Sequence, residues 1–158
     1  MHFIKSYKNQ MEIRKLKPSE VSHFKLLIGI FKEVFENTDT MPSDEHLSML
    51  LRKSDFFVLV ASVNFEIVGG LTVHILSSYY TEKPVAYIYD VGIHPRFQRQ
   101  GIGKSLMEFL NQYCIENGFQ EAYVEAETDD LDAVNFYRKT NFSHEIQATH
   151  FTYFFGED

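Results

Sequence analysis

The sequence predicts a mixed α/β fold in which helices cover both faces of one sheet. A chain of 158 residues is of the usual size for one domain. Its residues are 44% hydrophobic and 15% aromatic, enough to bury a core that offsets the entropy lost on folding. Strand-like and helix-like apolar periodicities alternate along the chain, so strands and helices are interspersed. We expect one domain over residues 11–158, preceded by a mobile extension over residues 1–10.

The first expected elements are a strand and two helices. Residues 11–16 alternate apolar and polar side chains, which is typical of a half-buried strand. Pro18 begins a helix start signal, and we expect that helix to end near residue 36. Ser43 can cap a second short helix that ends near residue 53, because its hydroxyl can accept a hydrogen bond from a free amide of the first turn.

Three strands come next. The apolar run at residues 56–62 predicts a buried strand, and Asn64 begins a turn into a second strand at residues 67–76. Residues 77–84 are polar and predict a loop. Residues 85–93 (VAYIYDVGI) predict another strand, which an aspartate and a glycine interrupt.

The last part of the chain alternates helices and strands. Helical periodicity over residues 101–117 is followed by Gly118, a residue type common just past a helix end. The remaining patterns predict a strand at 122–126, a helix at 132–140, and closing strands at 144–148 and 150–155. The total is about seven strands and about four helices.

Charge and composition exclude several classes of function. The formal net charge of -7 disfavours nucleic acid and favours a cationic partner, because phosphate binding needs a basic face. No apolar run approaches the roughly 20 residues of a membrane span. The single Cys114 cannot form an internal disulfide, and we expect a cytoplasmic protein. The histidines lack a metal-binding spacing, so we expect no metal.

The most specific pattern is a basic loop followed by glycines that open a helix. Unsatisfied amides in the first turn of a helix bind anions, and glycines let the anion approach the backbone. Gly101 lacks the upstream glycine of a Walker loop, and the residue three past Gly103 is not the glycine of a dinucleotide fingerprint. The basic side chains of the loop are Arg96, Arg99 and Lys104. The loop therefore suits a diphosphate.

Gln98, Gly101 and Gly103 have the spacing Gln-x-x-Gly-x-Gly, which resembles the acyl-CoA pyrophosphate motif of the GNAT acetyltransferases. The resemblance implies that acetyl-CoA is the cosubstrate. It also implies a mostly antiparallel sheet that is splayed between its fourth and fifth strands. The residues that would hold the cosubstrate at this loop are Gln98, Arg99, Gln100, Gly101, Ile102, Gly103 and Lys104.

The interrupted strand at residues 85–93 resembles the bulged strand of the same family. A bulge removes backbone groups from the ladder. By resemblance, the amides of Val91 and Ile93 would hold the pantetheine arm and the thioester carbonyl. An aspartate within an apolar strand is disfavoured and needs a functional reason. We therefore expect Asp90 to orient or deprotonate the amine.

A second signature over residues 130–142 extends the resemblance. Ala133, Tyr137 and Phe142 match the family's pattern, whereas Asp130 stands where the family has asparagine. By resemblance, Tyr137 is the general acid that protonates the CoA thiolate.

The expected acceptor is a cationic amine. Four carboxylates that could hold its ammonium groups follow the start of the fifth strand: Glu125, Glu127, Asp129 and Asp130. Residues 11 to 155 are similar to the type I aminoglycoside 3-N-acetyltransferases. The stretches that carry this similarity are Pro42-Ser43-Asp44 with Leu47 and residues 50–52, then Tyr87-Ile88-Tyr89-Asp90, and Asp130, Ala133, Val134 and Tyr137. The similarity implies acetylation of the 3-amino group of an aminoglycoside antibiotic, a resistance activity.

Two other interpretations remain open. A polyamine, a small amino metabolite or a protein amine would suit the same acidic site, although a lysine side chain, with a pKa of about 10.4, needs a stronger base. Alternatively, the chain is a CoA-binding domain that has lost catalysis. The aromatic tail at residues 151–155 could also form the surface of a homodimer.

Overall fold

The computed structural model describes residues 10–156, so nearly all of the predicted extension over residues 1–10 lies outside the described range. The chain divides into two compact units, residues 1–125 and residues 126–158. The single domain over residues 11–158 stays a prediction. The elements of the first unit are β1 (Met11–Lys15), α1 (Val21–Val34), α2 (Asp44–Arg52), β2 (Phe56–Val63), β3 (Glu66–Leu76), β4 (Val85–Ile93), the 3-10 helix η1 (Pro95–Phe97), α3 (Ile102–Glu116) and β5 (Glu121–Val124).

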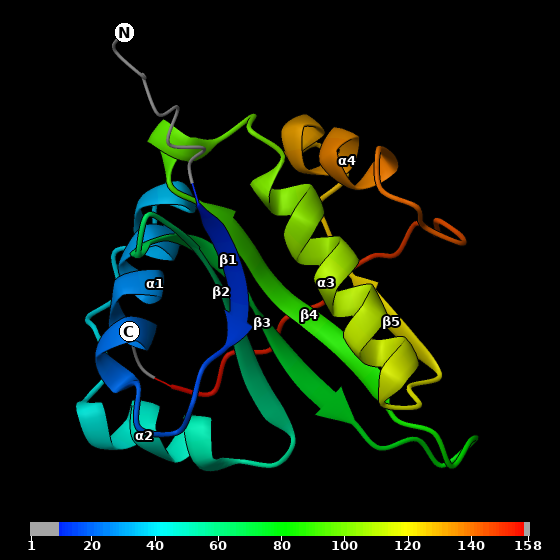
Figure 1. Ribbon diagram of the computed structural model, residues 1–158. Coiled ribbons are helices and arrows are strands. Elements are labelled where there is room, and N and C mark those ends of the chain that lie inside the picture. Colours follow the sequence, from blue (N-terminus) through cyan, green and yellow to red (C-terminus); the bar gives the residue numbers. More distant parts are fainter. Residues whose placement is uncertain (1–9, 157–158) are drawn as a thin grey trace, which may run out of the picture. The chain divides into compact units, whose positions relative to one another are not determined.

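Five strands form one mixed sheet in the order β1-β2-β3-β4-β5 (Figure 1). The first four strands are antiparallel neighbours, and β5 runs parallel to β4. The pairing between β4 and β5 ends where Ile88 of β4 lies opposite Val124 of β5, whereas β4 continues to Ile93. The sheet therefore opens between β4 and β5, which confirms the predicted mixed, mostly antiparallel sheet with its splay.

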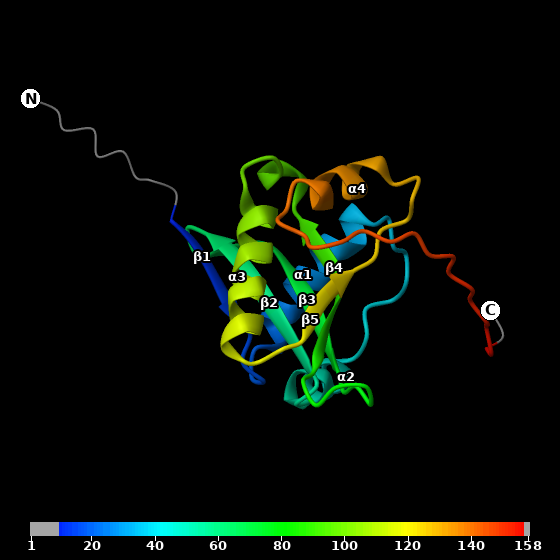
Figure 2. The same cartoon turned by 90° about the vertical axis from the view of Figure 1, so that its right-hand side faces the viewer.

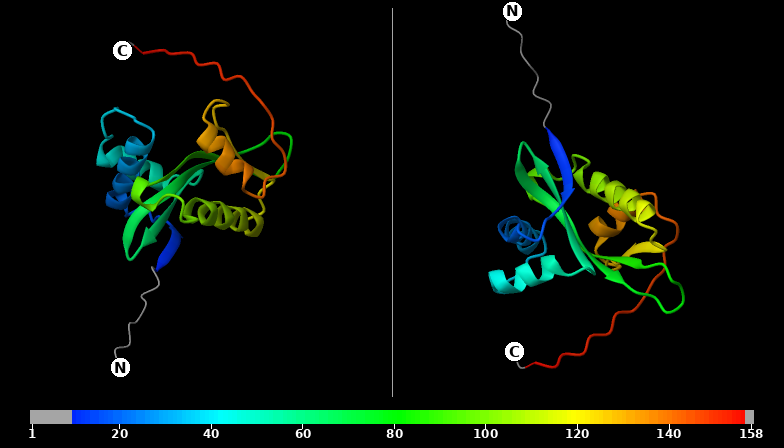
Figure 3. Two further views of the ribbon diagram at one scale, coloured as in Figure 1. Left: turned by 90° about the horizontal axis from the view of Figure 1, so that it is seen from above. Right: turned by 60° about the horizontal axis from the view of Figure 1, so that its bottom comes forward.

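Helices cover both faces of this sheet, as predicted. α1 and α2 lie on one face and α3 lies on the other (Figure 2, Figure 3). Successive residues of β2 point to opposite faces. Val58 joins the apolar core with α1 and α2, while the ring centroid of Phe57 lies 4.9 Å from that of Tyr113 on α3. The apolar run of β2 is thus buried on both sides.

Local sequence explains where α2 begins and how closely α1 packs on the sheet. Ser43 caps α2, as predicted, because its hydroxyl oxygen accepts a hydrogen bond from the amide of His46 at 3.2 Å. α1 lies close to β4 because Gly92 has no side chain. A Cβ atom at Gly92 would lie 2.7 Å from Cδ1 of Phe31. The end of α1 is thereby held against the part of β4 that follows Asp90.

The second unit contains α4 (Leu131–Arg138) and the chain that follows it. The predicted closing strands at residues 144–148 and 150–155 are wrong, because residues 141–156 contain no strand. Alternating β-type residues form a strand only where a neighbouring strand completes their hydrogen bonds, and this segment has no ladder partner within residues 10–156. The sheet accordingly has five strands in the described part of the chain rather than seven.

Candidate active site

A β-bulge in β4 shapes the candidate site. Thr72 of β3 pairs with Asp90, and the next residue, Val73, pairs with Ile88, so Tyr89 is an extra residue in β4. The bulge lets two successive side chains, Tyr89 and Asp90, line the same cavity. The hydroxyl of the buried Thr72 accepts a hydrogen bond from the amide of Asp90 at 3.3 Å and so holds the bulge. The predicted bulge is therefore present.

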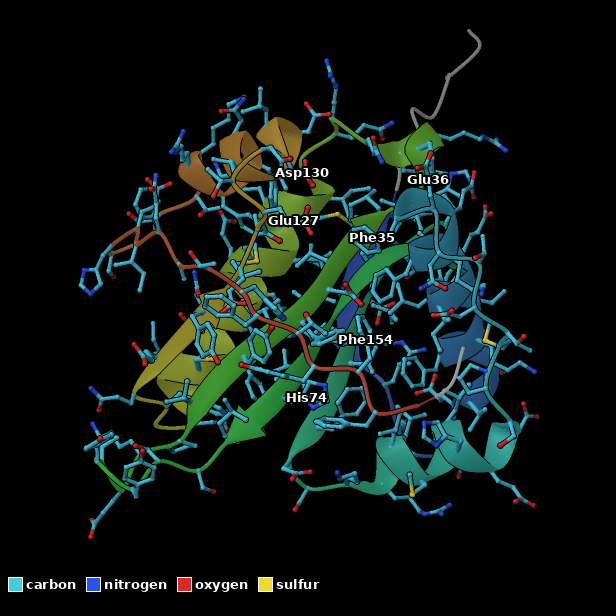
Figure 4. The ribbon with its side chains drawn as sticks, turned by 180° about the vertical axis from the view of Figure 1, so that it is seen from behind. Phe35, Glu36, His74, Glu127, Asp130 and Phe154 are labelled. Carbon is cyan, nitrogen blue, oxygen red and sulfur yellow. The ribbon has the colours of Figure 1, made fainter. Side chains whose placement is uncertain are left out.

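The cavity lies between α1, the loop that follows it, and strands β3 and β4. Its volume is about 460 Å³, within the range of small-molecule sites. Two of its residues are labelled in Figure 4, Phe35 just past the end of α1 and His74 on β3. Aromatic and apolar side chains form most of the wall, and its Asp and Lys side chains are Asp39, Asp90 and Lys32, so carboxylates outnumber the lysine. Such a wall suits an organic cation of moderate size.

Asp90 is the half-buried carboxylate of this cavity. Burial raises the pKa of Asp90 above its ordinary value. No lysine or arginine within residues 10–156 is in ion-pair contact with it. A carboxylate with a raised pKa and no basic partner binds protons and cations more strongly than a solvated one, and this is the property that amine deprotonation requires.

The backbone of β4 past the bulge offers hydrogen-bond donors at the open side of the sheet. The amide of His94 donates to the carbonyl of Val68 on β3 at 2.7 Å. Because backbone groups alternate in direction along an antiparallel strand, the amides of Val91 and Ile93 point away from β3. They lie beyond Ile88, where the pairing with β5 has ended. The geometry thus leaves the two predicted donors at the splay.

Gln98 takes part in closing the loop that follows β4. Its side-chain amide donates to the carbonyl oxygen of Ile93 at 3.0 Å. A second side-chain amide, that of Gln100, donates to the carbonyl of Arg96 at 3.4 Å. These two predicted cosubstrate residues therefore stabilise the loop conformation itself.

The loop enters α3 through two residues with left-handed backbone angles, Arg99 with φ of 60° and Gly101 with φ of 81°. No side chain caps α3, and the amide of Ser105 is the first to bond back, to the carbonyl of Gly101 at 3.0 Å. The amides of residues 102–104 are therefore left for another acceptor. With exposed Arg99 and Lys104 beside them, these amides fit a diphosphate.

The remaining predicted site residues fall in different parts of the chain. Glu125 follows β5 in the first unit, whereas Tyr137 lies on α4 in the second unit. Figure 4 shows Glu127 and Asp130 on the segment that leads into α4. Asp130 caps α4, because its carboxylate accepts a hydrogen bond from the amide of Ala133 at 3.1 Å. Its predicted contact with substrate stays a prediction.

Among the cavity residues that the sequence did not single out, three lie on β3 and β4 near Asp90. Thr72, His74 and Tyr89 all line the cavity with Asp90. The ring of His74 meets the ring of Tyr89 edge-on, with 5.6 Å between centroids. Thr72 and His74 are polar residues within the apolar run of β3, and this could have marked them as site residues. Whether they lie beside Asp90, however, depends on the register between β3 and β4.

Two features are absent from residues 10–156. No helix in this range is long and apolar enough to cross a membrane. No group of three or more His, Cys, Asp or Glu side chains in the same range is arranged to hold a metal ion.

Residues 24–142 match the acetyltransferase (GNAT) family. The chain therefore belongs to the GNAT acetyltransferases, and enzymes of this family use acetyl-CoA. The bulged β4, the splay and the open N-terminus of α3 are the features that this cosubstrate would need.

Known structures bring the similarity closer to one kind of acetyltransferase. The chain is 43% identical to an aminoglycoside acetyltransferase, meta-AAC0020, from an uncultured soil metagenomic sample, solved in complex with trehalose. The two superpose with a TM-score of 0.90 over 92% of this chain and 97% of the other. A second structure of that protein contains sisomicin. Another soil aminoglycoside acetyltransferase, HMB0005, is 27% identical, with a TM-score of 0.82 over 91% of this chain and 99% of the other.

A more distant relative carries the name of another kind of acetyltransferase. N-alpha-acetyltransferase 60 of Xenopus tropicalis is 29% identical over 104 residues, which are 55% of this chain. The match spans only 43% of that relative's length.

Proposed function

We propose that this protein transfers the acetyl group of acetyl-CoA to an aminoglycoside, at its 3-amino group. The observation that carries the proposal is the cavity beside the bulge, in which the half-buried Asp90 faces aromatic walls. The 43% identity to an aminoglycoside acetyltransferase over nearly the whole chain supports the substrate class. The net charge of -7 suits a polycationic acceptor.

Different residues of the chain carry out the separate steps of acetyl transfer. Asp90 accepts a proton from the ammonium group, which frees the nitrogen lone pair to attack the thioester carbon. The amides of Val91 and Ile93 donate to the carbonyl oxygen as negative charge develops on it, an effect that typically lowers the barrier by a few kcal/mol. Tyr137 donates its phenolic proton to the sulfur as the carbon–sulfur bond breaks. The amides and basic side chains at the start of α3 hold the diphosphate of CoA.

CoA release by the purified protein tests this proposal. The protein is supplied with acetyl-CoA and, in parallel, with gentamicin, spermidine or a lysine peptide. We expect rapid release with gentamicin and slow release with the others. Release only with spermidine or the peptide would keep acetyl transfer and overturn the aminoglycoside. No release with any amine would favour a binding domain without catalysis.

The position of acetylation needs a separate measurement. NMR of the acetylated gentamicin identifies the nitrogen that carries the new amide. Acetylation at the 3-amino group is expected. A product acetylated at another amine would retain the substrate class and overturn the assigned position.

A further inference from the structure

Three tyrosines form a continuous row that starts at the cavity and runs across the sheet to β5. The rings of Tyr87 and Tyr123 are stacked, with 4.8 Å between centroids and an interplanar angle of 15°. Tyr89 meets Tyr87 edge-on, with 6.0 Å between centroids. Tyr89 lines the cavity together with Asp90. We call Tyr89, Tyr87 and Tyr123 the tyrosine row.

The tyrosine row is accessible to solvent and presents both apolar rings and polar hydroxyls. Tyr89 is 60% exposed, Tyr123 is 37% exposed, and Tyr87 is half-buried. Tyr87 and Tyr123 use one face each to stack on one another, and this stacking leaves their hydroxyls for other partners. Each tyrosine combines an apolar ring with a hydroxyl that can donate and accept a hydrogen bond. A sugar offers matching groups, since it has apolar C–H faces and many hydroxyls.

The charges near the row select a cation. Burial, and after it the negative charge of Glu125, raises the pKa values of Tyr87 and Tyr123. Both phenols therefore stay protonated and neutral at neutral pH, while the carboxylate of Glu125 acts close to them. Asp90 lies at the other end of the row. An ammonium group is favoured there by the carboxylates and by the faces of the rings, whereas an anion is repelled.

The length of the row fits a ligand larger than one sugar ring. Because of the bulge, Tyr87 and Asp90 pair with His74 and Thr72, which are two residues apart on β3, and this corresponds to roughly 7 Å at the usual rise of a strand. Tyr123 is one strand spacing further, on β5. An amine held at Asp90 by a single ring would not reach Tyr123, but a molecule of several linked rings would.

We infer that the tyrosine row, with Glu125, binds the rings of a multi-ring amino sugar that lie beyond the ring being acetylated. This inference rests on the proposed function and adds a second subsite to it. Asp90 alone at the reacting amine would not distinguish a multi-ring antibiotic from a smaller amine. The second subsite would favour the antibiotic, because its additional rings gain contacts that a one-ring amine cannot make.

The test compares two acceptors that share one ring. KM is measured for gentamicin, which has several rings, and for 2-deoxystreptamine, which has one. Tyr123→Phe removes a hydroxyl and keeps the ring that stacks on Tyr87, and Glu125→Gln removes the charge. Tyr79→Phe is the matched control, because Tyr79 is 89% exposed and its ring contacts that of Tyr80 at a tilt in the loop before β4, outside the row.

Tyr123→Phe and Glu125→Gln, which we call the row variants, should each raise the ratio of KM for gentamicin to KM for 2-deoxystreptamine by about threefold to tenfold, the range expected for one lost hydrogen bond. Tyr79→Phe should leave this ratio unchanged. An unchanged ratio in both row variants, or an equal rise in KM for both acceptors, would overturn the second subsite. Absence of gentamicin turnover in the unmodified protein would instead overturn the proposed function, and the inference with it.

Discussion

Replacing Asp90 with asparagine isolates the charge of the proposed base. Asparagine has nearly the same size, and the hydrogen bond to the hydroxyl of Thr72 is made by the backbone amide of residue 90, which the substitution keeps. The bulge and the cavity should therefore survive in Asp90→Asn. A positioned general base contributes typically about 10²- to 10⁴-fold to rate. We expect kcat to fall within this range while KM for acetyl-CoA stays within about twofold.

The pH dependence follows from the raised pKa of Asp90. The base acts when deprotonated, so kcat/KM should fall as pH drops through that raised pKa, and the decline should disappear in Asp90→Asn. The effect on stability has the opposite sign. Between the unfolded and the raised folded pKa, the folded state binds more protons, so burial of Asp90 lowers the free energy of unfolding as pH rises through this window. Asp90→Asn should lack that loss.

The assay is CoA release at saturating gentamicin for kcat and at gentamicin concentrations well below KM for kcat/KM, over acidic to neutral pH. Urea unfolding is the measure of stability. Asp39→Asn is the control, because Asp39 lines the same cavity but is exposed. Unchanged turnover in Asp90→Asn would remove Asp90 from the mechanism. Equal losses in the two variants would show that the total charge of the cavity matters, rather than a base at one position.

Three further predictions concern two glycines and one helix cap. Gly92→Ala should lower the free energy of unfolding in urea by about 1–3 kcal/mol, because its Cβ would press on Phe31. Gly101→Ala should cost about 1–2 kcal/mol by the same measure, because φ there is 81°, and should raise KM for acetyl-CoA. Ser43→Ala should cost about 1 kcal/mol through loss of the α2 cap and leave kcat unchanged. A stable Gly92→Ala, an unaltered KM in Gly101→Ala, or an inactive Ser43→Ala would contradict these assignments.

Much of the fold could be predicted because it depends on local patterns. The cap at Ser43, the start of α3 after Gly101 and the left-handed Gly118 beyond it are properties of a few neighbouring residues, and all are present. The apolar runs that became β2 and β4 were likewise visible, since a strand that is buried in a sheet needs apolar side chains.

The errors arose where a distant partner decides the structure. The residues between 144 and 155 have strand-forming composition, but the described chain supplies no neighbouring strand for them. Composition reports a preference for extended backbone, whereas a strand requires hydrogen bonds from another segment.

The sequence by itself determined the family and the glycine-opened start of α3 that we propose binds the diphosphate, because a glycine at a helix start acts through its own backbone. It also singled out Asp90 as a polar residue that an apolar strand would not otherwise contain. Only the tertiary structure decided which side chains share the cavity with Asp90. The pairing of Thr72 with Asp90 makes Tyr89 the extra residue, and a shift of one residue in that register would turn these side chains to the other face of the sheet.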